Sequence, residues 1–209
     1  MGEFPLFEQM MVATPYVLSF TAGGLLYHES LVVAEELLRA RFDWKVAIKA
    51  VQDGNLLQSR TESTAKRKLR EVRNRLQALS RDEIQLLAEG GRQEQKLILW
   101  LACCLKYQIL ADFARDVLRS KYLQLDLSLD RDDVDRFIDN KTIWHEELEK
   151  LAPSTRTKLQ TVMLRMLRES EMLSPEGAIL PPIFSENLTR VIRDDSPEHF
   201  LLFPTAVPE

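Results

Sequence analysis

The chain has 209 residues, of which 45% are hydrophobic and 29% charged, and its formal net charge is −4. Such a composition excludes a wholly disordered chain, because it supplies enough apolar side chains for a core. The apolar run Leu97–Leu105 is far shorter than the roughly 20 residues that cross a bilayer, and the N-terminus lacks the features of a signal peptide. We therefore expect a cytoplasmic protein that has no membrane contact.

The first part of the chain is expected to be helical after a short arm or added strand that ends at Pro15. Gly23-Gly24 permits a turn, and helical spacing of apolar residues predicts a helix over about residues 28–41. A second helix is predicted over residues 43–53, with the aspartate at its start as N-cap and Gly54 as the residue that ends it.

Residues 63–79 form the most distinctive predicted helix. Apolar residues recur at helical spacing along one side of it: Ala65, Leu69, Val72, Leu76 and Leu79. Six cations occupy the remaining positions: Lys66, Arg67, Lys68, Arg70, Arg73 and Arg75. Either the threonine at position 61 or the serine at position 63 is expected to cap this helix.

Positive charge is concentrated in this helix. Residues 59–76 hold seven basic and two acidic side chains, whereas residues 123–209 hold 10 basic and 17 acidic ones. Four of the six cations are arginines, whose forked donors suit phosphate. We predict that Lys66, Arg67, Arg70 and Arg73 bind a polyanion. The alternatives are an acidic protein surface as partner, or an ordinary solvated helix face.

The next segments are also predicted to be helical. Ser80 and Glu83 have the spacing of a capping box and predict a short helix that stops at Gly90-Gly91. Residues 92–122 are predicted to form one long central helix, apolar on most sides. The adjacent Cys103 and Cys104 are interpreted as core residues within it.

A composition shift near residue 123 predicts a domain boundary, with an N-terminal helical domain over residues 1–122 and a smaller domain over residues 123–209. The alternation of residues 123–130 predicts a strand. Helices are expected at about 132–140, 142–151, 154–172 and 186–193, and short strands at 178–184 and 199–203. The predicted fold is mostly α: an N-terminal helical bundle followed by a winged helix-turn-helix-like α/β module.

The third helix of such a module is the element that reads a DNA groove. In the helix predicted to start at Ser154 or Thr155, the polar side carries hydroxyl groups and cations, which suit phosphate and base contacts. Its candidate DNA-binding residues are Lys158, Thr161, Arg165 and Arg168. The alternative is a solvated face beside an acidic domain.

Motifs for catalysis are absent from the sequence, which contains no phosphate-binding glycine loop and no nucleophile elbow. None of the three histidines, His28, His145 and His199, has metal-ligand spacing with a cysteine or another histidine, and His145 is interpreted as a surface residue. The acidic residues 130–135 are interpreted as the N-terminus of a helix. We expect no enzyme activity, no cofactor and no metal site.

Several stretches resemble a known bacterial family. They are Ala22-Gly-Gly-Leu-Leu with Glu29-Ser, residues 55–67, Arg70-Glu-Val-Arg-Asn-Arg-Leu, residues 105–113 and residues 154–159. Together they resemble BrxA, the small helical component of BREX phage-defence systems, over roughly residues 20–172.

The resemblance implies a cytoplasmic, non-enzymatic protein that binds double-stranded DNA and works beside other BREX components. It assigns no DNA contacts by position, so the candidate residues rest on helical spacing alone. Our hypothesis is a DNA-binding accessory factor. The alternative is an assembly scaffold that binds an acidic surface of a partner BREX protein.

Overall fold

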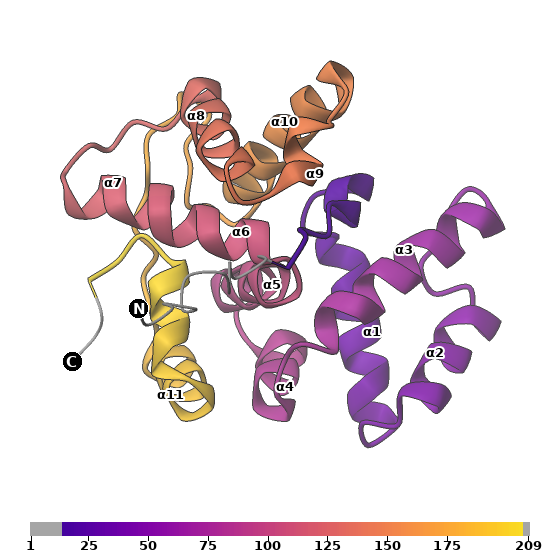
Figure 1. Cartoon of the computed structure of the whole chain (residues 1–209). Coiled ribbons are helices and arrows are strands. Elements are labelled where there is room, and N and C mark those ends of the chain that lie inside the picture. The colour runs from indigo at the N-terminus through magenta and orange to yellow at the C-terminus, as the bar shows by residue number, and fades with distance from the viewer. Residues whose placement is uncertain (1–13, 207–209) are drawn as a thin grey trace, which may run out of the picture.

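Helices make up nearly all the regular structure of residues 14–206, which the computed structural model describes (Figure 1). The predicted mostly-α class is confirmed. Of the arm or strand predicted to end at Pro15, residues 1–13 lie outside the described residues. In chain order the elements are η1 (Ser19–Ala22), α1 (Tyr27–Arg39), α2 (Trp44–Asp53), α3 (Glu62–Leu76), α4 (Arg81–Glu89), α5 (Arg92–Lys106), α6 (Gln108–Phe113), η2 (Ala114–Arg119, a π-helix), α7 (Ser120–Leu123), α8 (Arg131–Thr142), α9 (Glu146–Glu149), α10 (Pro153–Glu169), α11 (Glu186–Asp195) and η3 (Pro197–Leu202).

The helix starts in the N-terminal half follow the predicted capping chemistry. The Asp43 side chain accepts hydrogen bonds from the first backbone N–H groups of α2. Thr61, one of the two predicted candidates, caps α3 by accepting from the Thr64 N–H at 3.2 Å. Ser80 and Glu83 make both bonds of the predicted capping box at α4. Local side chains thus satisfy N–H groups that a helix cannot satisfy internally.

The prediction of one long helix over residues 92–122 is wrong. Tyr107 has an extended backbone (φ −121°, ψ 100°), and α5 makes an angle of 115° with the following segment. Its ring is buried and its hydroxyl donates to Glu71 at 2.6 Å, which holds this residue in the core. Helix-forming residues surround the break, so periodicity alone does not locate it. The interpretation of Cys103 and Cys104 as buried core residues is confirmed.

No single described helix is long and apolar enough to cross a membrane, although α5 together with residues 108–123 passes that test as a bent pair.

The C-terminal part has fewer strands than predicted. Pairing among the described residues is limited to two antiparallel bridges, Ser128 with Ala178 and Leu173 with Ile179. The helix predicted over 142–151 is only the short α9, and Ala152, not the predicted serine or threonine, is the N-cap of α10. The strand predicted at 199–203 is largely the 3-10 helix η3, which begins at a proline. Phe200 in η3 and Phe203 just after it pack against Phe184.

The buried apolar residues form one cluster that runs from η1 to η3 and crosses residue 123, so the predicted two-domain division stays a prediction. Helix α5 lies at the centre, and its Trp100 donates to the backbone oxygen of Leu202 at 2.8 Å. Helices α1–α3 lie on one side of α5 and α8 with α10 on another, while η1 contacts both α3 and α10 (Figure 1). His145, predicted at the surface, is buried and stacks on Tyr16.

Candidate nucleic-acid interface

Helix α3 packs on the protein by the predicted apolar stripe. Leu69, Val72 and Leu76 are buried, Ala65 is half-buried, and Leu79 is buried just beyond the end of the helix. This side of α3 faces η1, α1 and α5. The stripe therefore fixes which positions of the helix remain available to a partner.

Arg75, one of the six cations of this helix, is not part of the available surface. Its side chain is 1% exposed. Its Nε donates to Glu71 at 2.7 Å and its Nη1 donates to the backbone oxygen of Gly24 at 2.7 Å. Burial lowers the pKa of Arg75, but negative neighbours that include Glu71 raise that pKa by more. Arg75 is therefore a charged structural residue.

Two lysines of α3 also have carboxylate partners. Lys68 binds Glu29 of α1 at 2.6 Å, and both side chains are partly buried. Burial raises the pKa of Glu29, but the Lys68 ammonium lowers it by more. Lys66 binds Glu62 at 2.5 Å, but this pair is well exposed. Exposed pairs are weak, so Lys66 can exchange its partner for a phosphate at little cost.

Arg67, Arg70 and Arg73 are the available arginines of α3. All three are exposed, and no carboxylate within residues 14–206 pairs with them. At 100° per residue, these arginines and Lys66 fall within an arc of about 120°. The four predicted α3 residues thus share one exposed side, whereas Lys68 and Arg75 are held by the protein itself.

Helix α10 also presents its predicted polar side. Lys158, Thr161, Arg165 and Arg168 are exposed, and the opposite side of the helix is buried. Arg165 binds Glu169 at 2.6 Å, and the Thr161 hydroxyl donates to a backbone oxygen within the helix. For Lys158 and Arg168 the described part of the chain provides no carboxylate partner.

The turn after α10 lies beside this polar side. Leu129 donates to the Gly177 oxygen and Ile179 donates to the Leu127 oxygen, both at 2.8 Å. Gly177 has φ 93°, and a Cβ there would meet the Leu129 oxygen at 2.8 Å, so this turn requires glycine. A shallow hollow between the turn and α10 is lined by Thr161 and Arg168 among others.

Comparison with known proteins assigns this chain to a family. The family model for BrxA matches residues 14–196, which is most of the chain. The chain belongs to the BrxA family. The resemblance found in the sequence is thereby confirmed.

Two relatives support the BrxA assignment. The chain is 28% identical over 148 residues to "BREX protein BrxA" of Escherichia coli O9:H4 (strain HS), covering 71% of this chain and 69% of the relative. It is 27% identical over 161 residues to "BREX protein BrxA" of Paramagnetospirillum magneticum (strain ATCC 700264 / AMB-1), covering 76% and 79%. The crystal structure of an uncharacterized protein from Magnetospirillum magneticum shares the fold, with a TM-score of 0.77 and 21% identity over 90% of this chain and 97% of that one.

In this BrxA family member, the Gly23-Gly24 stretch joins the two candidate helices. Glu169 of α10 accepts the Leu25 N–H at 2.6 Å, while Arg75 of α3 binds the Gly24 oxygen. A Cβ on Gly24 would collide with the Glu169 carboxylate. Sequence reasoning missed these structural residues. The spacing of Glu71 and Arg75, four apart on a helix, was the available signal.

Proposed function

We propose that this protein is a non-enzymatic DNA-binding component of a BREX system, which holds the phosphate backbone through α3 and α10. The observation that carries the proposal is the exposed set Lys66, Arg67, Arg70 and Arg73 on one side of α3. Its three arginines have no carboxylate partner in the described residues. An acidic protein that keeps three such arginines without a carboxylate partner favours a polyanionic partner.

The second part of the proposal is that residues 127–180 act as a reduced winged helix-turn-helix. A bridge-forming segment precedes α8, α9 and α10, and a tight turn follows them, which is the order of such modules. The bridges at Ser128 and Leu173 support this interpretation. In this arrangement α10 would lie against DNA, with Lys158, Thr161, Arg165 and Arg168 toward it. Arg165 would then exchange its exposed Glu169 contact for phosphate.

The test measures the affinity of the full chain for an unrelated duplex by fluorescence anisotropy at several salt concentrations. Four α3 contacts give a slope of log affinity against log salt of about −3.6, since each phosphate contact contributes about −0.9. Replacing Arg70→Glu and Arg73→Glu together should abolish measurable binding and leave the helical circular-dichroism signal intact. A matched control, Lys45→Glu with Arg190→Glu, makes the same charge change on α2 and α11 and should bind nearly as the parent does.

A variant with Lys158→Ala and Arg168→Ala tests α10 separately, and its salt slope should be less steep by about 1.8. If the α3 double variant binds the duplex as tightly as the parent, the assignment of α3 is wrong. If the parent fails to bind the duplex even at low salt, the scaffold alternative replaces DNA binding. The same arginines would then be expected to bind an acidic surface of another BREX protein.

A further inference from the structure

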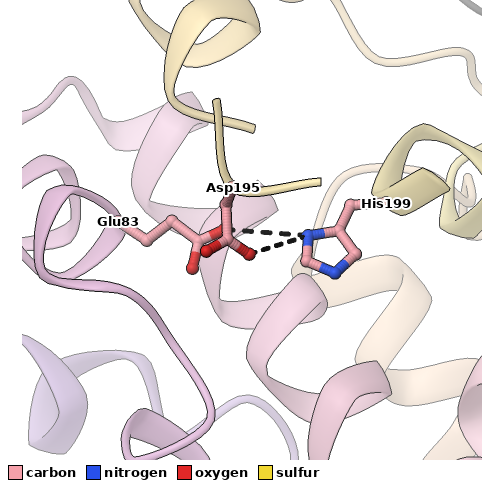
Figure 2. A group of neighbouring side chains, drawn as sticks. All are labelled: Glu83, Asp195 and His199. Carbon is pink, nitrogen blue, oxygen red and sulfur yellow. Dashed lines mark ion pairs between the residues drawn. The ribbon is translucent and has the colours of Figure 1, made fainter. Parts of the chain in front are cut away.

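Three side chains from separate elements converge away from α3 and α10. Glu83 lies in the first turn of α4, Asp195 is the last residue of α11, and His199 belongs to η3 (Figure 2). The His199 Nδ1 lies 3.4 Å from an Asp195 oxygen and 4.0 Å from Glu83 Oε1. One potential ligand atom from each residue lies within 4.8 Å of the other two.

Two buried polar atoms of this group have no hydrogen-bond partner among the described residues. Glu83 is fully buried, and while its Oε2 accepts the Ser80 N–H at 2.8 Å, its Oε1 has no hydrogen-bond partner among the described residues. The His199 Nδ1 is likewise buried and without a hydrogen bond there. Buried polar atoms are nearly always paired, so these two neighbouring polar atoms are candidates for binding a ligand.

We propose that Glu83, Asp195 and His199 bind one divalent transition-metal ion of the Zn²⁺ class. A tetrahedral Zn²⁺ site with bonds of about 2.0–2.2 Å separates its ligand atoms by roughly 3.3–3.6 Å. The distance between His199 Nδ1 and the Asp195 oxygen already matches this range. The distance between His199 Nδ1 and Glu83 Oε1 would need to shorten by about half an ångström. One imidazole nitrogen with two carboxylate oxygens suits Zn²⁺, whereas Mg²⁺ prefers oxygen ligands alone and six of them.

The carboxyl groups of this site favour a cation, and Arg115 is a positively charged neighbour of His199. Glu83 is a fully buried carboxyl group that lies near the carboxyl groups of Asp195 and Asp82. Metal binding uses the neutral form of the His199 imidazole. A bound cation would supply the positive charge that this buried carboxylate lacks. It would also link the start of α4 to Asp195 and His199, which lie more than a hundred residues later in the chain.

The site has an open side. Asp195 is one-third exposed, so an ion can enter from solvent. The group contains three protein ligands, which leaves a fourth position for water. Sequence spacing did not reveal it, because Glu83 lies more than a hundred positions before Asp195 and His199 and already has a role in the capping box.

The experiment measures Zn²⁺ binding to the full chain by isothermal titration calorimetry after removal of metals with EDTA, together with melting temperatures with and without Zn²⁺. The parent should bind one Zn²⁺ per chain, and Zn²⁺ should raise its melting temperature by several degrees. Asp195→Asn and His199→Gln should each weaken binding at least tenfold and lose the thermal shift. The matched controls Asp194→Asn and His28→Gln should keep both.

Melting temperatures in EDTA show whether each variant still folds, and Glu83→Gln is a further variant because glutamine preserves the capping box. Co²⁺ provides a spectroscopic check, since its visible absorption reports the coordination of the bound ion. The proposal is overturned if the parent shows no saturable binding of Zn²⁺. It is equally overturned if the Asp195 and His199 variants bind Zn²⁺ as the parent does. Neither result bears on the DNA contacts proposed for α3 and α10.

Discussion

Arg75 of α3 and Arg156 of α10 show how the two candidate DNA-binding helices are held in different ways. Each arginine binds a carboxylate side chain and a backbone oxygen. Arg75 does so at 1% side-chain exposure, with Glu71 and Gly24 as partners. Arg156 is 28% exposed and binds Asp135 and Asp139 of α8, the second of which is largely exposed.

The same kind of ion pair is therefore expected to contribute differently to stability at Arg75 and at Arg156. Around Arg75 there is little water to replace a lost partner, and Tyr107 also depends on Glu71. Around Arg156, solvent can hydrate either partner if the pair opens. We therefore expect α3 to be a rigid part of the protein and α10 to be anchored to α8 more weakly.

The largest effect is expected from Arg75→Met, which keeps an apolar stem but leaves the Glu71 carboxylate buried without its cation. Breaking a buried pair from one side costs about 3–5 kcal/mol in the free energy of unfolding. Urea unfolding followed by circular dichroism measures it.

Adding Glu71→Gln to Arg75→Met should recover much of this loss, because it removes the unpaired charge while an oxygen remains for the Tyr107 hydroxyl. Arg67→Met, on the exposed side of the same helix, should change stability by less than about 0.5 kcal/mol. Equal effects of Arg67→Met and Arg75→Met would show that Arg75 is not structural.

The different positions of these arginines also show what the sequence could predict. Helical spacing identified the packed side of α3, and turn and cap residues such as Ser80 located the helix ends. These features depend on neighbouring residues. The burial of Arg75 depends on Gly24 and Tyr107, and the break after α5 depends on a contact of Tyr107 with Glu71, all of them distant in the sequence. Such contacts leave no local pattern.

The residues of the candidate sites also differ in whether the sequence could predict their placement. Exposed positions such as Arg70 and Lys158 follow from the apolar stripes opposite them, so their placement could be predicted. The internal pairing of Lys68 with Glu29 could not be, because it depends on how α1 packs against α3. The three residues proposed to bind metal depend on the packing of α4, α11 and η3, which no spacing rule describes.

Substitution of Asp133 is expected to have an intermediate, pH-dependent effect on the free energy of unfolding. This residue stabilises the start of α8 as part of its capping box. Burial raises its pKa, but bonds from the Asp130 backbone, Arg136 and Lys121 lower it by more, so the folded protein binds its proton less readily than the unfolded chain. The stabilisation is therefore present above the unfolded pKa of about 3.9 and is lost as the pH falls through the folded value.

Asp133→Asn should consequently reduce the free energy of unfolding by roughly 1–2 kcal/mol at pH 7, and by much less at pH 3. Urea unfolding at both pH values measures the difference. Asp132→Asn removes the same charge from the exposed neighbouring position and should have a smaller effect at neutral pH. A loss for Asp133→Asn that stays constant down to pH 3 would contradict the role of its charge.

The smallest effect is expected from Arg156→Met, the α10 counterpart of Arg75→Met. Exposed pairs contribute about 0–1 kcal/mol, and salt screens them, so the loss should be near 0.5–1 kcal/mol at low salt and should shrink in 1 M NaCl. Urea unfolding at both salt concentrations measures it, with Lys158→Met as the exposed control on the same helix. A salt-independent loss as large as that of Arg75→Met would mean that α10 is held as rigidly as α3. A loss that salt removes would show that the α10 anchor is weakened under the same conditions that weaken phosphate contacts.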